Sequence, residues 1–235
     1  MKRWWTTPAY VAVAVSLLAT AGCSSSDTAQ PAAGGSGPAS SKAGSSASPV
    51  SLAQFPVTVA TGGKTVTITK KPTRIVSLSA TVTEDLFAIG AGAQVVAVDK
   101  TSDYPASAPH TSLDAYQLNA EAVAAYHPDL VVESGLTPAQ VGQLEALKLP
   151  VIGEPAAGDL EQVYQQITDL GKVTGNASSA AALVGSMRQK IAGIVASTPK
   201  PPAGATFYYE LDPTYYSVTT STFVGQLFKT LGLTS

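Results

Sequence analysis

The chain has 235 residues, of which 45% are hydrophobic and only 13% are charged, so it can bury one or two cores beneath a lightly charged surface. Its formal net charge is -2 and no basic stripe occurs, which excludes a nucleic-acid-binding surface. The only cysteine is Cys23, which excludes an intrachain disulfide.

Residues 1–22 have the pattern of a secretory signal peptide. A short positive start precedes an apolar run at residues 9–19 that is too short to span a bilayer comfortably, and small residues lead to Cys23. This arrangement resembles a bacterial lipobox, although Thr20 stands where leucine is commoner. The resemblance implies that Cys23 is diacylated and anchors the protein to the outer face of the cytoplasmic membrane. The alternative is ordinary secretory cleavage beside an incidental cysteine.

A linker and a hairpin follow. Residues 23–50 are mainly Ser, Ala, Gly and Pro, so we expect a flexible linker behind the lipidated cysteine. The alternating segments 57–60 and 65–69 flank a Gly-Gly-Lys-Thr sequence and predict a β-hairpin. That sequence is not a phosphate-binding loop, because such a loop would need glycine where Thr58 stands.

Strand and helix patterns alternate four times in the next part of the chain, and they predict an N-terminal lobe over residues 51–155. Apolar strands are expected at residues 74–78, 94–98, 130–132 and 151–152, with helices from a Thr81–Glu84 capping box, from Asn119 to before Pro128, and from Thr137 or Pro138 to Leu147. The alternation indicates an α/β fold with a Rossmann-like, mostly parallel central sheet. No Gly-x-Gly-x-x-Gly follows the first strand, so a dinucleotide site is not indicated.

Connecting helices are predicted over residues 156–198. Apolar residues recur at helical spacing from residue 159 to 173 and again from 178 to 195, with a break at Gly175 and Asn176. The second helix would span roughly 27 Å at ~1.5 Å per residue. It is long enough to join two lobes, but periodicity alone does not distinguish this role from ordinary packing.

Residues 199–235 are predicted to begin a second lobe. A proline-rich break precedes an expected strand at 205–211, a loop with two tyrosines, and an expected helix at 222–231. A lobe needs on the order of 100 residues, so we expect this one to be incomplete in the sequence.

Two short patterns resemble a known family. They are Ser-Asp-Tyr-Pro at residues 102–105, and Asn-Ala-Glu at 119–121 followed by His-Pro-Asp-Leu-Val at 127–131. Their order and spacing are similar to those of the substrate-binding lipoproteins of ABC importers for vitamin B12, ferric siderophores and haem. The resemblance implies two Rossmann-like lobes joined by one long helix, no catalysis and no cofactor. It also implies an extracytoplasmic monomer whose partners are an ABC permease and a metal chelate or corrinoid.

The predicted ligand residues lie in loops after the strands, because parallel sheets bind ligands at the carboxyl ends of their strands. From the residues alone, these loops carry Ser79, Asp103, Tyr104, Tyr116, Glu133, Ser134 and Glu154, and tyrosine suits a large flat ligand with a polar rim. Of these, we predict ligand contact for Ser79, Asp103, Tyr104, Tyr116 and Ser134. The alternative is that both tyrosines only pack their loops onto the lobe. The resemblance implies that Tyr104 and an aromatic residue near Tyr116 face the ligand, and that Tyr216 or Tyr215 faces it from the second lobe.

Glu121 has two interpretations. In the first turn of a helix its carboxylate is favoured by the helix dipole, which needs no partner. The resemblance implies instead that it is exposed and docks onto arginines of the permease, where a charge sets orientation and association rate more than affinity.

The sequence gives little support to two other functions. An enzyme is not predicted, because the chain lacks Gly-x-Ser-x-Gly and His-Glu-x-x-His motifs and its only cysteine is expected to carry lipid. A direct zinc or manganese receptor would have His110, His127, Asp103 and Glu133 as ligand types, but only His110 falls on a plausible loop. Among chelates, Ser-Asp-Tyr-Pro favours corrinoids, whereas siderophores usually call for Arg or Lys, for which Lys100 is the nearest candidate.

Overall fold

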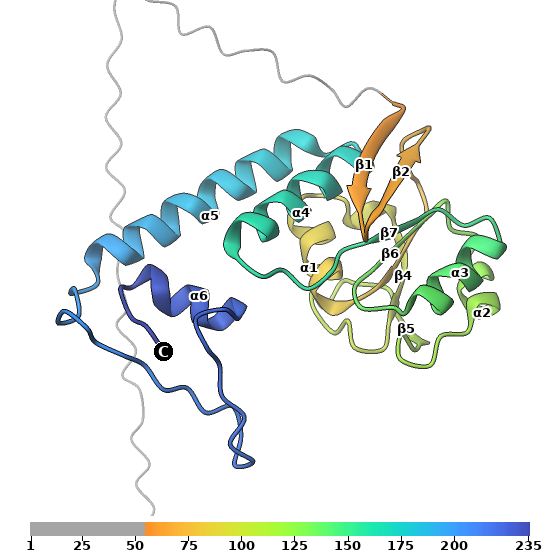
Figure 1. Cartoon of the computed structure of the whole chain (residues 1–235). Helices are drawn as coiled ribbons and strands as arrows, with labels where there is room; N and C mark the ends of the chain where they lie inside the picture. The colour runs from red at the N-terminus through yellow and green to blue at the C-terminus, as the bar shows by residue number, and fades with distance from the viewer. Residues whose placement is uncertain (1–54) are drawn as a thin grey trace, which may run out of the picture. The chain divides into compact units, whose positions relative to one another are not determined.

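The computed structural model describes residues 55–235, so the predicted signal peptide, the predicted lipidation site Cys23 and the whole predicted linker lie outside the described residues (Figure 1). Its centre is one parallel sheet of five strands in the order β5-β4-β3-β6-β7. The strands are β3 (Ile75–Leu78), β4 (Val95–Asp99), β5 (His110–Leu113), β6 (Leu130–Glu133) and β7 (Val151–Gly153). The predicted α/β class with a Rossmann-like parallel sheet is therefore confirmed.

Helices cover both faces of this sheet, and the strands alternate between the two cores. The helices of the lobe are α1 (Ala80–Ala88), α2 (Ala120–Ala124), α3 (Pro138–Ala146), α4 (Leu160–Thr174) and α5 (Ala177–Ser197). Ile75 belongs to the core under α1, α4 and the start of α5, whereas the next residue, Val76, belongs to the core under α2 and α3. Burial on both faces explains why these strands are near-continuous apolar runs.

Two predicted boundaries were wrong, and one strand was not predicted. The helix after β3 begins at Ala80 with Ser79 as its N-cap, because the Ser79 side chain accepts a hydrogen bond from the Val82 amide; the predicted Thr81–Glu84 box does not form. Gln94 closes the short 3-10 helix η1 (Gly92–Gln94) rather than starting β4. Strand β5 was not predicted at all, because it is a polar edge strand in which only Leu113 is buried.

The predicted hairpin forms as β1 (Val57–Thr61) and β2 (Lys64–Ile68), paired antiparallel. Gly62 and Gly63 make its two-residue turn with φ of 56° and 74°, which is the left-handed conformation that glycine adopts without strain. The hairpin packs on the core beside α4 through Val59 and Ile68, and Thr61 donates a hydrogen bond to the Gly153 carbonyl.

The long helix α5 has 21 residues and would extend for roughly 31 Å. Its first half packs on α4 and the sheet core through Ala180, Leu183 and Met187. Its second half carries the exposed Ile194. No helix in the described part of the chain is long and apolar enough to cross a membrane.

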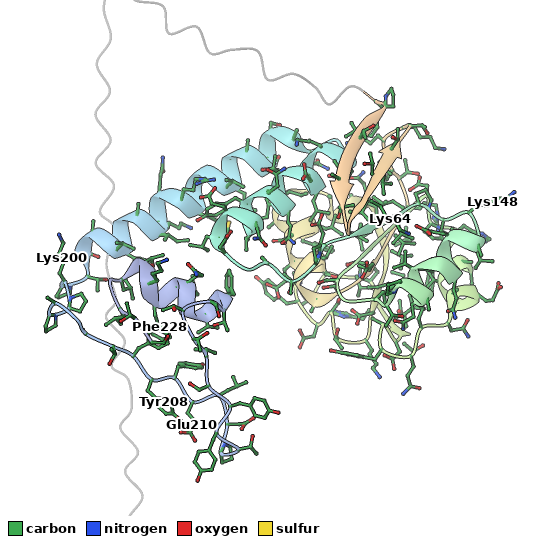
Figure 2. The ribbon with its side chains drawn as sticks, viewed as in Figure 1. Lys64, Lys148, Lys200, Tyr208, Glu210 and Phe228 are labelled. Atoms are coloured by element: carbon green, nitrogen blue, oxygen red, sulfur yellow. The ribbon has the colours of Figure 1, made fainter. Side chains whose placement is uncertain are left out.

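The predicted strand at 205–211 is wrong. This segment makes only two isolated bridges, Thr206 with Thr234 and Glu210 with Ser217. The predicted helix after it is present as α6 (Phe223–Thr230), with Thr222 as its N-cap. Figure 2 shows Phe228 of α6 facing the extended segment that carries Tyr208 and Glu210, and its ring stacks on Phe207 at 4.5 Å. A β-rich pattern needs neighbouring strands to pair with, and the described residues supply none here.

Candidate functional site

A hollow of about 460 Å³ lies at the carboxyl ends of β3, β4 and β6. Its lining includes three of the predicted ligand residues, Ser79, Tyr116 and Ser134. The rest of the lining is Leu78, Ala80, Thr81, Asp99, Thr101, Ala115, Gly135 and Leu136. This is the edge at which open parallel sheets bind ligands.

Local chain geometry sets the first lining residues. Ser79 caps α1, so part of its hydroxyl's hydrogen-bonding capacity is already used. The amide of Tyr116 donates to Asp114 Oδ1 at 2.9 Å, which fixes the turn while the Tyr116 ring stays 83% exposed. Lys100 pairs with Asp114 at 2.6 Å and is the main reason why the pKa of that carboxyl lies below its usual value. Tyr116 is therefore held by its backbone and not by packing of its ring.

A buried polar network beneath this hollow was missed by the sequence reasoning. The Asp99 carboxylate, which is 1% exposed, accepts hydrogen bonds from the hydroxyls of Ser102 and Thr101, both at 2.6 Å. Thr83 donates to Ser102 Oγ and can also bond Ser77 Oγ, each at 2.9 Å. The network ties α1 to the loop after β4. A buried aspartate at the end of an apolar strand was the signal that could have revealed it.

The remaining predicted ligand residues do not line this hollow. Asp103 and Tyr104 lie on the loop that Asp99 and Ser102 anchor, and the Tyr104 ring is 64% exposed. Tyr215 and Tyr216 lie at the tip of the turn closed by Glu210 and Ser217, and both are exposed. The structure thus brings together Ser79, Tyr116 and Ser134 only.

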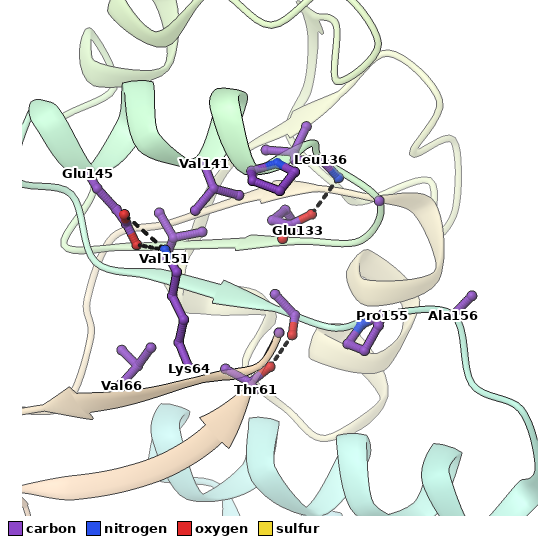
Figure 3. Close-up of a pocket in the computed structure, with 14 residues that line it drawn as sticks. Thr61, Lys64, Val66, Glu133, Leu136, Val141, Glu145, Val151, Pro155 and Ala156 are labelled. Atoms are coloured by element: carbon purple, nitrogen blue, oxygen red, sulfur yellow. Dashed lines mark hydrogen bonds and ion pairs between the residues drawn. The ribbon is translucent and has the colours of Figure 1, made fainter.

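A second hollow, of about 300 Å³, adjoins the first and shares Thr81 and Ser134 with it. It extends from α1 to the segment after β7 and is lined by two carboxyl groups, Asp85 and Glu154. A third, of about 290 Å³, lies between the hairpin and α3 (Figure 3). Figure 3 shows three polar contacts there: the Leu136 amide donates to Glu133, Lys64 pairs with Glu145, and the Thr61 hydroxyl donates to the Gly153 carbonyl.

Glu154 is the most perturbed of these groups. It is buried, and its Oε1 has no hydrogen-bond partner among residues 55–235. Burial, and then the nearby carboxyl groups of Asp169, Asp85 and Glu133, raise its pKa to about 8. Burial also raises the pKa of Asp85, to about 6. Glu154 is therefore mostly protonated at neutral pH.

We predict that the free energy of unfolding declines as pH rises from about 5 to about 8 because of Glu154. The folded state keeps this proton up to a pKa of about 8, whereas an unfolded glutamate loses it near its ordinary 4.5. The unfolded state thus binds fewer protons in that interval, and stability is lost with rising pH. Urea denaturation of the wild type and of Glu154→Gln across this range measures it. The variant should decline less steeply; parallel curves would contradict the assignment.

The described residues do not gather three or more His, Cys, Asp or Glu side chains in a metal-binding arrangement. His110, expected on a loop, starts the edge strand β5. His127 follows α2, with its carbonyl accepting a hydrogen bond from Arg74.

These features define a parallel-sheet lobe with polar hollows at the carboxyl ends of its strands, and comparison with known proteins assigns the class. A family model described as "Periplasmic binding protein" matches residues 75–235. The chain belongs to this family. Its members are binding proteins, in agreement with the expectation that the chain is not an enzyme.

Several curated relatives are similar. A cobalamin-binding protein of Halobacterium salinarum is 29% identical over 185 residues, covering 76% of this chain and 50% of the relative. An ABC transporter substrate-binding lipoprotein of Bacillus subtilis is 29% identical over 187 residues, covering 75% of this chain and 60% of the relative. A vitamin B12-binding protein of Yersinia pestis is 35% identical over 104 residues, covering 43% of this chain and 36% of the relative. The chain thus spans about half the length of the curated relatives that it matches.

Solved structures share the fold. A possible iron-binding periplasmic solute-binding protein from Staphylococcus epidermidis aligns with a TM-score of 0.62 and 26% identity, over 70% of this chain and 67% of the other. A periplasmic heme binding protein from Pseudomonas aeruginosa aligns with a TM-score of 0.51 and 28% identity, over 58% of this chain and 52% of the other.

Proposed function

We propose that the protein is the extracytoplasmic binding component of an ABC importer for a metal chelate of the corrinoid, ferric-siderophore or haem class. The observation that carries this proposal is the hollow at the carboxyl ends of β3, β4 and β6, in a chain of the periplasmic binding protein family. Binding there requires no chemical step. Corrinoids are the favoured class, because the relative from Halobacterium salinarum, which aligns over three quarters of the chain, is named for cobalamin.

The side chains at this edge suit such a ligand. Exposed tyrosine rings at positions 104 and 116 offer flat apolar faces, and their hydroxyls can bond polar substituents at the ligand's rim. The hydroxyls of Ser79 and Ser134 add short polar contacts in the hollow. We assign ligand contact to these four residues and to Asp103, with Tyr215 and Tyr216 contributing from the C-terminal segment.

The anchor belongs to the same proposal. Lipid on Cys23 would hold the binding domain at the outer face of the cytoplasmic membrane, close to the permease, while the linker over residues 24–50 lets it move. The name of the Bacillus subtilis relative, a lipoprotein, supports this part. We propose that the protein acts as a monomer.

Titration of the full chain with cyanocobalamin, a ferric hydroxamate siderophore and haemin tests the ligand class. Quenching of tyrosine fluorescence and isothermal calorimetry should both show saturable binding of one of them. Saturation by cyanocobalamin alone would confirm the corrinoid assignment. Failure of all three to bind would overturn the proposed function.

We predict that Glu121→Ala leaves ligand affinity unchanged but lowers uptake by cells. Glu121 is exposed in the first turn of α2, whose N-cap is Asn119, so its carboxylate is free to meet a permease. Ligand titration and uptake of labelled ligand measure the two effects separately. Glu84→Ala, which removes an exposed glutamate from α1, is the matched control and should affect neither. Equal loss of binding and uptake in the Glu121 variant would show that Glu121 is structural.

A further inference from the structure

A separate pocket of about 450 Å³ lies under the turn of the β1–β2 hairpin, beside α4. Hairpin residues 60–65 form one wall, and the other consists of Glu154, Pro155, Gln162, Gln165, Gln166 and Asp169. None of the predicted chelate-binding residues lines it. The pocket shares no lining residue with the hollow assigned to the chelate, and Glu154, Pro155 and Gln166 separate it from the second hollow, which they also line.

The α4 wall of this pocket presents hydrogen-bond acceptors. The Gln165 amide nitrogen donates to Asp169 Oδ2 at 2.7 Å, and the Gln166 amide nitrogen donates to the Pro155 carbonyl at 2.6 Å. Both bonds use the donor end of the side chain, so the two carboxamide oxygens remain available as acceptors. The carboxyl groups of Glu154 and Asp169 add further acceptors.

Among the described residues, the two carboxyl groups of the pocket differ in their partners. Asp169 is paired with Lys172 at 2.7 Å, whereas Glu154 is 94% buried and has no partner for Oε1 in the described part of the chain. Lys64, on the hairpin wall, is tied to Glu145 at 2.8 Å. A buried polar atom without a partner carries a desolvation cost that a bound donor would remove.

We propose that this pocket binds a small primary ammonium compound, held by the carboxylates of Glu154 and Asp169 and by the carboxamide oxygens of Gln165 and Gln166. An ammonium group has three donors and no acceptor, which complements a wall made of acceptors. Its positive charge compensates the carboxylate that lacks a partner. A metal ion fits less well, because the described residues do not bring three His, Cys, Asp or Glu side chains into a metal-binding arrangement.

Binding at this pocket is coupled to a proton. Glu154 must ionise to pair with an ammonium group, and its pKa is raised to about 8 by burial and by Asp169, Asp85 and Glu133. Affinity therefore rises roughly fiftyfold between about pH 6 and about pH 8, and binding at any pH below about 8 releases a proton. The two lysines nearest the pocket, Lys172 and Lys64, are already paired with Asp169 and Glu145.

Propylammonium chloride is the probe, titrated into the full chain at constant ionic strength. Nuclear magnetic resonance should show saturation with a dissociation constant on the order of millimolar, with shifts at the Gln165 and Gln166 side-chain amides. Calorimetry at neutral pH in two buffers of different ionisation enthalpy should show proton release. Tetramethylammonium, which has the same charge but no N–H donor, should bind at least tenfold more weakly.

Variants make the test specific. Glu154→Gln keeps the shape of the side chain and should abolish both the proton release and the pH dependence, while Asp169→Asn should weaken binding several-fold. Glu210→Gln, at an exposed carboxylate in the C-terminal segment, should bind like the wild type. Absence of saturation, equal binding of tetramethylammonium, or unchanged proton release in Glu154→Gln would each overturn the proposal. Chelate binding is titrated separately, so failure of the ammonium proposal and failure of the proposed function can be distinguished.

Discussion

Replacement of Tyr104 with alanine is expected to weaken ligand binding at least tenfold without unfolding the lobe. The ring is 64% exposed, so its removal leaves no cavity in the core. Its loop is held from below by Ser102 and Asp99, whose hydrogen bonds the substitution leaves in place. A tenfold loss corresponds to about 1.4 kcal/mol, which is ordinary for one aromatic contact at a binding surface.

Calorimetric titration with the chelate that binds the wild type measures this loss, and thermal unfolding checks that the fold is intact. Tyr208→Ala is the matched control, because Tyr208 is also exposed but is not among the predicted ligand residues. Unchanged affinity of Tyr104→Ala would show that this ring does not contact the ligand. A lowered melting temperature with a proportional loss of binding would show that the ring stabilises its loop and does not bind the ligand.

Replacement of Gly171 with valine is expected to destabilise the protein by about 3 kcal/mol or more, because overpacking a tight contact displaces whole elements. Even the Cβ of an alanine at this position would lie 2.3 Å from Ala180 Cβ and 3.3 Å from Ala177 Cα. Both neighbours belong to the first turns of α5, so α4 and α5 would have to separate. The packing of Ala180 into the sheet core would be lost with them.

Urea denaturation monitored by circular dichroism measures the free energy of unfolding for this variant. The control is Gly142→Ala in α3, where an added Cβ meets nothing within 4 Å. That variant should be slightly more stable than the wild type, by about 0.5–1 kcal/mol, because alanine is the better helix former. If Gly171→Val were as stable as Gly142→Ala, α4 and α5 would not be packed as the structure has them.

Much of the fold could be predicted from the sequence because its strands are apolar on both faces. The four apolar strands, β3, β4, β6 and β7, and the helices after them follow from hydrophobic runs and from the break before Pro128. Strand β5 could not be predicted, because its His-Thr-Ser sequence has no apolar period. The prediction of a strand at 205–211 failed for the opposite reason. The residue pattern is strand-like, but a strand forms only if other strands, distant in the sequence, pair with it.

The site was less predictable than the fold. Ser79, Tyr116 and Ser134 could be placed at one edge because loops after parallel strands meet there. The role of Ser79 as a helix cap and the support that Asp99 gives to the Tyr104 loop depend on hydrogen bonds between separate segments. The burial of Glu154 and the lack of a hydrogen-bond partner for its Oε1 depend on how the hairpin and α4 pack around it, and no local sequence pattern reveals this packing.

Native mass spectrometry of the protein taken from its own membrane would detect a bound chelate without any choice of probe. It reports on the same molecules any retained ligand and any lipid on Cys23. The proposed function requires a chain that carries diacylglycerol on this cysteine and a bound corrinoid or iron chelate. A chain with neither lipid nor chelate, which also fails to take up cyanocobalamin, ferric siderophore or haemin when they are added, would contradict it.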